Sequence, residues 1–296
     1  MATVQGMRKI LVAPVAIAAT LAVTATAGAI NSYNAVEAPE RTEVGAYVAL
    51  WDSADPDAAP DRFDWVCSGT MVDDDTFLTA AHCTTDWPEG TRHFVSLEQD
   101  VQGWLDDAAG LGLSGPAAVT WALDEGLVVE GTPHWDPAYP GNGADSHDIG
   151  VLEVPTMADS DWSFDPAQLP TAGQLSTVGS RALDAASWWV VGYGTQEAQR
   201  GPGGHTHPGG GTRLKAAEDF NALNKTWVRL AMNESRDLGG ACYGDSGGPN
   251  FVELGGTLVL AATTITGDVP CYATNVVYRL DTPSARAFLE DFVDLP

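Results

Sequence analysis

Basic residues are scarce in this chain of 296 residues. Lys and Arg together number 14 against 40 Asp and Glu, and the formal net charge at pH 7 is −26. Proteins that bind nucleic-acid phosphates or anionic membranes present clustered cations, which this composition does not supply. The charge balance therefore argues against nucleic acid and anionic lipid as partners, although acidity alone identifies no partner.

Long apolar runs are absent after the first thirty residues. Arg8 and Lys9 precede an uncharged apolar stretch at residues 10–25, and the sequence AGA at 27–29 resembles a signal-peptidase site. A retained membrane anchor is the alternative, but the stretch is rich in Ala and Thr rather than Leu. We expect residues 1–29 to be a cleaved signal peptide, and the mature protein to be secreted without stable membrane association.

Cysteine is limited to four residues, and no two of them form a Cys-x-x-Cys motif. Cys67 and Cys83 lie early in the chain, and Cys242 and Cys271 lie late. Export to an oxidising space favours disulfides, and four cysteines can pair in three ways. The histidines are not at zinc-finger spacing from these cysteines, and His205 and His207 lie in a Gly/Pro-rich loop without a nearby carboxylate or thiolate. We expect no metal site and no cofactor.

Internal repeats, heptads and convincing helices are few. The best helical segment is Pro283–Val293, which Asp281 or Thr282 can cap, and a weaker one is Glu98–Ala109. Short runs rich in Val, Thr and Trp dominate instead, separated by turn residues: Val44–Trp51, Trp65–Val72, Thr76–Ala81, Ile149–Val154, Ser187–Tyr193, Thr226–Met232, Thr257–Thr264 and Val276–Leu280. Many short strands with few helices indicate an all-β fold.

Three short segments carry residues suited to acyl transfer. His82 lies in TAAHC (79–83), Asp148 immediately precedes an apolar strand in DIGVL (148–152), and Ser246 lies among glycines in GDSGGP (244–249). A nucleophilic serine needs a base within hydrogen-bonding reach, a carboxylate to orient the base, and N–H donors for the oxyanion. Each segment alone has an ordinary structural explanation, but their coincidence in a secreted all-β chain favours a catalytic triad.

Chain order separates the rival hydrolases. The α/β-hydrolase esterases place their histidine after the serine, whereas all six histidines here precede Ser246. The subtilisin order would need an aspartate before His82 in a predominantly α/β pattern, and the sequence does not show that pattern. The order of residues therefore excludes the α/β-hydrolase fold, and the pattern of strands argues against the subtilisin fold.

The three motifs resemble those of the chymotrypsin/trypsin-like serine proteases, and the similarity extends over residues 30–296. The resemblance implies two six-stranded antiparallel β-barrels with the active site between them. The first would span about 30–168, the second about 169–282, and a C-terminal helix about 283–293. It also implies that His82 is the general base and acid, that Asp148 orients it, and that Ser246 is the nucleophile.

Further roles follow from the same resemblance. The backbone N–H groups of Gly244 and Ser246 would form the oxyanion hole. The disulfides would be Cys67–Cys83, beside the histidine, and Cys242–Cys271, across the specificity pocket. A free amino terminus at Ile30, exposed by signal peptidase itself, would form an activating ion pair with Asp245.

The resemblance also suggests the substrate preference. Gly240 occupies the pocket-base position that is Asp in trypsins, Gly267 fits the glycine of the open wall, and Val276 fits a deeper wall position. A neutral pocket of this kind implies an apolar or medium-sized residue before the scissile bond. Asp268, near the rim, adds a possible attraction for basic residues.

One departure from the family pattern is the long interval between the histidine and the aspartate. It implies an insertion between Gln99 and Gly143, whose residues Trp104, Trp121 and Trp135 are expected to be core. His147 neighbours Asp148, but successive side chains of an extended segment face opposite sides, so we expect a surface or turn histidine.

The sequence therefore predicts a monomeric secreted serine endopeptidase acting on proteins or peptides. Two alternatives remain: a catalytically weak binding protein on the same fold, and a hydrolase that prefers esters.

Overall fold

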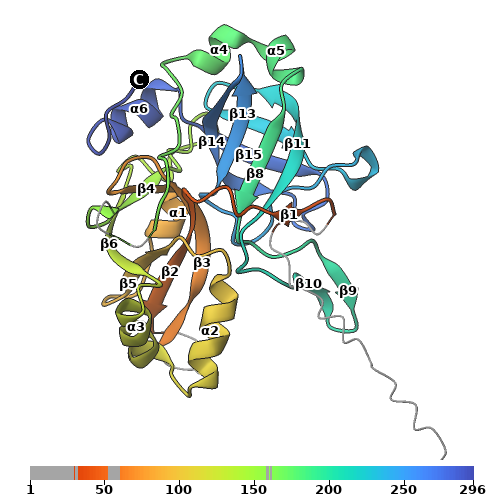
Figure 1. The fold of residues 1–296 in the computed structure, drawn as a ribbon. Helices are drawn as coiled ribbons and strands as arrows, with labels where there is room; N and C mark the ends of the chain where they lie inside the picture. Colours follow the sequence, from red (N-terminus) through yellow and green to blue (C-terminus); the bar gives the residue numbers. More distant parts are fainter. Residues whose placement is uncertain (1–29, 31–32, 53–60, 158–159, 161) are drawn as a thin grey trace, which may run out of the picture.

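The computed structural model describes residues 30, 33–52, 61–157, 160 and 162–296. In that part of the chain, two closed six-stranded antiparallel barrels lie side by side, and the C-terminal helix α6 (Pro283–Leu289) packs beside them (Figure 1). The predicted all-β fold with two barrels and a C-terminal helix is confirmed. The predicted signal peptide, residues 1–29, lies outside the described residues.

The first barrel holds the histidine and aspartate segments. Its strands, in order around the barrel, are β2 (Val44–Trp51), β3 (Arg62–Met71), β4 (Thr76–Thr79), β7 (Gly150–Glu153), β6 (Val129–Trp135) and β5 (Arg92–Ser96). Pairing of β5 with β2 closes the barrel. Tyr47, Phe77 and Leu152 fill part of its interior and are wholly buried. This apolar interior is the main stabilising contribution, because each such side chain contributes about 1.5–3 kcal/mol when fully buried.

The second barrel holds the serine segment. Its strands, in order, are β8 (Trp188–Gly192), β11 (Leu214–Leu223), β12 (Trp227–Ala231), β15 (Thr274–Arg279), β14 (Thr257–Gly267) and β13 (Pro249–Leu254), and both β11 and β13 pair with β8. A short strand, β1 (Val36–Glu37), pairs with the outer part of β11. Trp188, Phe220 and Val252 belong to the core of this barrel.

A buried arginine lies between the two barrels. Arg213 precedes β11, and its guanidinium donates hydrogen bonds to the carbonyl oxygens of Ala38 (3.1 Å), Val44 (2.8 Å) and Leu97 (3.0 Å) and to the hydroxyl of Tyr193 (3.0 Å). A buried cation is tolerated only when its donors are satisfied. These bonds connect strand ends of the first barrel to the second, and so fix the interface at which the site lies.

The helices lie mostly outside the barrels. The insertion predicted after Gln99 forms two helices, α2 (Val101–Gly110) and α3 (Gly115–Asp124), and the Asp100 side chain caps the first by accepting from the N–H of Gly103. Trp104 packs against Phe63 and Trp121, so Trp104 is core as expected and Trp121 is partly buried against it. Trp135 is 43 % exposed at the end of β6, so the expectation that it is core is wrong. The remaining short elements are α1 (Ala81–Thr84), α4 (Gln174–Val178), α5 (Ser180–Asp184), η2 (Glu234–Arg236) and the hairpin of β9 (Gln199–Gly201) and β10 (Gly204–Thr206).

The predicted strands are present with small shifts of their ends, whereas seven of the strands in the described residues were not predicted. Four of these belong to the barrels, β5, β6, β11 and β13, and the other three are the short strands β1, β9 and β10. The sequence of β11, LKAAEDFNAL, contains Ala, Glu, Asp and Asn, which have low strand propensity, and β6 contains Gly131 and Pro133. Closure of the barrels supplies the pairing that local propensity does not predict.

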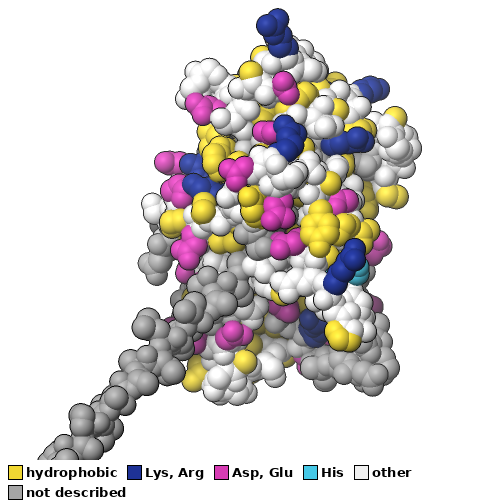
Figure 2. Space-filling model, turned by 90° about the vertical axis from the view of Figure 1, so that its right-hand side faces the viewer, with side chains coloured by type: hydrophobic (Ala, Val, Ile, Leu, Met, Phe, Trp, Pro, Cys, Tyr) yellow, Lys and Arg dark blue, Asp and Glu magenta, His cyan; other side chains and the backbone are white. Residues whose placement is uncertain are grey.

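The face of the molecule seen in Figure 2 is acidic, and its basic side chains do not form a patch. Asp and Glu side chains there are interspersed with single Lys and Arg side chains. Within the described residues, no helix has the length and apolar character needed to span a bilayer.

Candidate active site

The histidine and the predicted aspartate are joined by two hydrogen bonds. Strand β4 ends at Thr79, and His82 lies in the helical turn α1 that follows. The Nδ1 of His82 lies 2.9 Å from Oδ2 of Asp148, and the His82 backbone N–H donates to Oδ1 at 3.0 Å. Because a carboxylate only accepts, Nδ1 carries the proton, and Nε2 of the neutral ring is left as an acceptor. The imidazole is thus oriented as a base.

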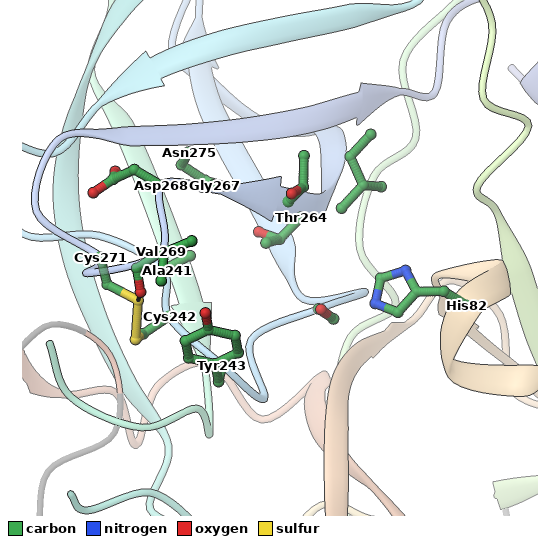
Figure 3. A pocket seen from close by; sticks show the side chains of 13 residues that line it. His82, Ala241, Cys242, Tyr243, Thr264, Gly267, Asp268, Val269, Cys271 and Asn275 are labelled. Atoms are coloured by element: carbon green, nitrogen blue, oxygen red, sulfur yellow. Dashed lines mark hydrogen bonds between the residues drawn. A yellow bond between two sulfur atoms is a disulfide. The ribbon is translucent and has the colours of Figure 1, made fainter. Parts of the chain in front are cut away.

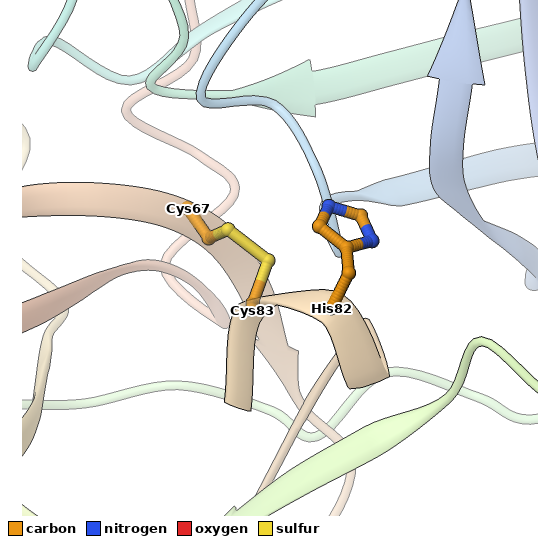
Figure 4. Close-up of side chains that lie close together, drawn as sticks. All are labelled: Cys67, His82 and Cys83. Atoms are coloured by element: carbon orange, nitrogen blue, oxygen red, sulfur yellow. A yellow bond between two sulfur atoms is a disulfide. The ribbon is translucent and has the colours of Figure 1, made fainter. Parts of the chain in front are cut away.

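A disulfide fixes the segment that carries His82. Cys67 of β3 is bonded to Cys83, the residue after His82, and Figure 4 shows the bond directly beside the imidazole. The side chain of His82 is 30 % exposed and that of Asp148 is 10 % exposed. The base is therefore open to a substrate, while the carboxylate that orients it is largely shielded from water.

The serine lies in a turn that approaches the first barrel closely. Gly247 adopts a φ of +77°, and a Cβ there would lie 2.1 Å from Oγ1 of Thr79 and 2.6 Å from the carbonyl oxygen of Ser68. Ser68 of β3 donates its N–H to the carbonyl oxygen of Ser246 at 2.9 Å, and its Oγ donates to the carbonyl oxygen of Gly244 at 2.9 Å. Glycine at 247 is needed because any side chain would overlap the facing strand.

The two predicted oxyanion donors have free N–H groups. Within the described residues, neither the N–H of Gly244 nor that of Ser246 donates to another group. Gly244 has a φ of +93°, and a Cβ there would lie 2.4 Å from the Trp65 ring. Unused N–H groups in a turn are what a developing oxyanion requires.

His82 and Ser246 line the same cavity, which has a volume of about 340 Å³. Figure 3 shows His82 at one end of this cavity and the Cys242–Cys271 disulfide at the other. The remaining lining residues come from the serine loop and from the segment around the end of β14: Ala241, Tyr243, Thr264, Ile265, Thr266, Gly267, Asp268, Val269 and Asn275.

Of the three predicted specificity residues, only Gly267 lines the cavity. Gly240 instead approaches Met232, whose side chain lies 2.3 Å from the position that a Cβ on Gly240 would take. Asn275 lines the cavity in place of Val276. The difference arises because adjacent residues of β15 face opposite sides, so a prediction one residue out of register selects the wrong face.

Asp268 does not offer a free carboxylate to basic substrates. Its Oδ1 accepts from the backbone N–H groups of Ala273 (3.0 Å) and Thr274 (2.6 Å), and its Oδ2 accepts from that of Tyr272 (2.9 Å). The carboxylate therefore orders the loop that contains Cys271. These neutral donors occupy its oxygens without cancelling its charge, so the attraction for basic residues considered from the sequence stays a prediction.

Asp245, the residue before the serine, is completely buried. Its Oδ1 accepts from the N–H of Gly194 and its Oδ2 from the N–H of Cys242, both at 2.8 Å. Burial raises the pKa of this carboxyl to about 7, although the two backbone hydrogen bonds oppose the rise. Within the described residues no cation pairs with this buried carboxyl, so Asp245 is suited to receive a positively charged group.

Ile30 lies close to the same glycine. Its side chain is fully buried against Val190, Leu214 and Ala241, and its backbone N–H donates to the carbonyl oxygen of Gly194 at 3.1 Å. In the uncleaved chain this nitrogen belongs to a peptide bond and carries no charge. Gly194 was not singled out from the sequence, although its position in Gly-Tyr-Gly after β8 is a recognisable turn signal.

Neither disulfide leaves sulfur available for a metal. The two groups of closely spaced ligand atoms in the described residues are Cys67 with His82 and Cys83, and His207 with Cys242 and Cys271. All four cysteines are in disulfides, so these groups lack thiolates. His207 instead packs edge-on against Tyr243 at the cavity.

The chain combines two β-barrels with a pair of His82 and Asp148 and a glycine-rich turn that contains Ser246. A family model described as Trypsin matches residues 58–286, which is more than half of the chain. The match covers all three motif segments and both disulfides. The chain therefore belongs to the trypsin family of serine peptidases.

Proposed function

We propose that the protein is a secreted serine endopeptidase that cleaves peptide bonds through an acyl-enzyme. The observation that carries this proposal is the oriented pair of His82 and Asp148 on the same cavity as Ser246. In a chain of the trypsin family, this arrangement supports general base catalysis by His82 and nucleophilic attack by Ser246.

The proposed reaction has two stages. Oγ of Ser246 attacks the scissile carbonyl carbon while Nε2 of His82 accepts the hydroxyl proton, and the N–H groups of Gly244 and Ser246 bind the oxyanion. The carbon–nitrogen bond then breaks, the amine leaves with the proton from His82, and an ester to Ser246 remains. Water, deprotonated by His82, hydrolyses this ester and regenerates the serine. Asp148 stabilises the imidazolium at both stages.

For specificity, we propose an apolar or medium-sized residue before the scissile bond. No free carboxylate lines the cavity, because Asp268 is engaged by three backbone N–H groups. Ala241, Ile265 and Val269 provide apolar wall surface. Peptides with Leu, Met or Phe at this position should be cleaved faster than matched Arg peptides, and the reverse order would contradict the proposal.

For activation, we propose that removal of residues 1–29 frees the amine of Ile30 to pair with Asp245. The proximity of both residues to Gly194 supports this proposal. Secretion through the same signal peptide accords with the two disulfides. We further propose that the mature protein is a monomer whose protease domain spans 30–296, with barrels at about 30–168 and 169–282 and the helix at about 283–293. N-terminal sequencing that finds a start at residue 38 or 42 would contradict activation at Ile30.

Labelling of the serine tests the catalytic proposal. An organophosphorus reagent should label the secreted protein stoichiometrically, and Ser246→Ala should abolish both labelling and peptide hydrolysis. A binding protein without catalysis would show neither in the wild type. An ester-preferring hydrolase would be labelled at Ser246 but would cleave peptide amides far more slowly than matched esters.

A further inference from the structure

His147, the residue before the proposed catalytic Asp148, lies between two other carboxylates, Asp136 and Asp145. Nδ1 of His147 lies 2.7 Å from Oδ2 of Asp136, and its Nε2 lies 3.8 Å from Oδ2 of Asp145. The His147 side chain is 25 % exposed, and the residue lies in a turn, as expected from the sequence. The first contact is a hydrogen bond, whereas the second is too long for one and brings the ring only near Asp145. The imidazole is therefore held by Asp136 and lies beside a second carboxylate.

Both carboxylates are anchored to other parts of the fold. Asp136 follows β6, accepts from the N–H of Ala138 at 2.9 Å, and donates its own N–H to the carbonyl oxygen of Ile149 at 3.1 Å. Asp145 accepts from the hydroxyl of Tyr278 in β15 at 2.8 Å and from Oγ of Ser284 in α6 at 2.7 Å. His147 thus lies where the first barrel, the second barrel and the C-terminal helix meet.

The backbone of His147 directs the next side chain. His147 has a φ of +51°, in the left-handed region, and the N–H of Ile149 donates to its carbonyl oxygen at 2.9 Å. This tight turn places the imidazole of His147 against Asp136, while Asp148 faces His82. A non-glycine residue stays in this region only where surrounding contacts hold it. The two carboxylates provide such contacts.

We propose that His147 is a positioning residue: its side chain is bonded to Asp136 and lies beside Asp145, and it thereby holds Asp148 in hydrogen-bonding position on His82. This inference rests on the proposed function and names a further residue on which it depends. His147 does not touch the substrate; it acts through Asp148.

The local charges give His147 a second effect. The titratable groups around it are Asp136, Asp145 and Asp148 on neighbouring segments, the phenol of Tyr278 through Asp145, and His82 beyond Asp148. Burial tends to raise the pKa of Asp145, but hydrogen bonds from Ser284, Tyr278 and the His147 backbone, with the charge of His147, hold it below its usual value. Loss of the His147 side chain would remove this charge from the neighbourhood of Asp136 and Asp145 and of Asp148, which contacts His82.

Three single variants test the proposal on the full secreted protein. His147→Ala should lower kcat by about 10²-fold, the typical cost of a displaced catalytic group, with little change in KM. His147→Asn should lose less, because Asn tolerates the left-handed turn but supplies no charge. The control is His134→Ala, which removes another histidine–carboxylate pair, with Glu153 at 3.3 Å, and should leave kcat unchanged.

The pH profile distinguishes positioning from mere support of the fold. With the imidazolium gone, the more negative surroundings stabilise protonated His82, so the acid limb of the kcat/KM profile should move to higher pH in both His147 variants. The double variant His147→Asn with Asp136→Asn should return the limb and kcat toward the wild type, because an uncompensated carboxylate is removed. If His147→Ala does not fold, the Asn single and double variants decide the question.

The outcomes separate the two proposals. Wild-type protein that neither labels with the organophosphorus reagent nor cleaves peptides contradicts the proposed function itself. Active wild-type protein whose folded His147 variants keep both kcat and the acid limb contradicts the positioning role alone. Failure of Asp136→Asn to restore any activity contradicts the role assigned to charge balance.

Discussion

The two halves of the site are each organised by an aspartate, but in opposite surroundings. Asp148 in the first barrel accepts from the side chain and backbone of His82 and retains some exposure. Asp245 in the second barrel is fully buried and accepts from the backbone N–H groups of Gly194 and Cys242. The first carboxylate orients His82, the proposed general base, whereas the second orders a loop. Removal of each should therefore impair a different property.

The largest effect is expected at Asp148. The substitution Asp148→Asn should lower kcat by about 10⁴-fold, because an amide no longer holds the proton-bearing Nδ1 and no longer stabilises the imidazolium. KM and thermal stability should change little. Steady-state kinetics and thermal unfolding measure both quantities, and a comparable loss of stability would remove the distinction between the two aspartates.

The disulfides extend the comparison to the backbone of each half. Cys67–Cys83 supports the histidine, with a sequence separation of 16, and Cys242–Cys271 supports the cavity, with a separation of 29. Replacing either pair by Ala should lower the free energy of unfolding by about 2–5 kcal/mol. Loss of the first should act mainly on kcat and loss of the second mainly on KM for peptides. Identical kinetic changes in both variants would contradict this division.

The buried Asp245 predicts that the stability of the uncleaved chain depends on pH. Its pKa is about 7 in the folded chain against an ordinary 3.8, so the folded state binds the extra proton between these values. Stability is highest below the ordinary pKa and falls as pH rises toward 7, by at most about 1.4 kcal/mol per pH unit.

Denaturant unfolding between pH 5 and 7 measures this slope in the uncleaved Ser246→Ala chain. The same variant beginning at Ile30 should show a flatter dependence, because its terminal amine can neutralise the carboxylate. Glu218, also buried with a pKa raised to about 8 by burial and by the charge of Asp245, adds a slope of the same sign in both chains. Equal slopes would contradict the proposed ion pair.

The smallest effect is expected at the helix outside both barrels. Oγ1 of Thr282 accepts from the N–H of Ala285 at 3.3 Å and caps α6. Thr282→Ala should destabilise the protein by about 1 kcal/mol and leave kcat unchanged. Chemical denaturation and peptide kinetics check both statements, and a large kinetic effect would show that α6 influences the site directly.

The triad segments were recognisable because each requires particular residues next to one another. The glycines around Ser246 allow a tight turn and the close approach of the facing strand, and Cys83 beside His82 forms a disulfide. The residues needed for the proposed function and those needed for local structure are therefore adjacent in the sequence. The helix α6 was predicted from its cap and apolar periodicity, and it ends earlier than expected, at Leu289. The insertion helix α2 was also predicted, and it starts later than expected, at Val101.

The cavity wall and the surroundings of His147 could not be predicted in the same way. Whether Asn275 or Val276 lines the cavity depends on the register of β15 against β14, which a single sequence does not determine. His147 is bonded to Asp136 and lies beside Asp145, and Asp145 accepts from Tyr278 and Ser284; only the folded chain brings these residues together. Strand β11 was missed because its pairing, not its composition, makes it a strand.

The bonds from Ser68 have a consequence for motion in the protein. Ser68 belongs to the first barrel, yet it holds the carbonyl oxygens of Gly244 and Ser246, and its Oγ also accepts from the N–H of Tyr193 at 2.9 Å. Rocking of one barrel against the other would break all of these bonds together. Ser68 therefore ties the segment that carries Ser246 to the barrel that carries His82, so a relative displacement of the barrels would disturb the contact between the two halves of the proposed site.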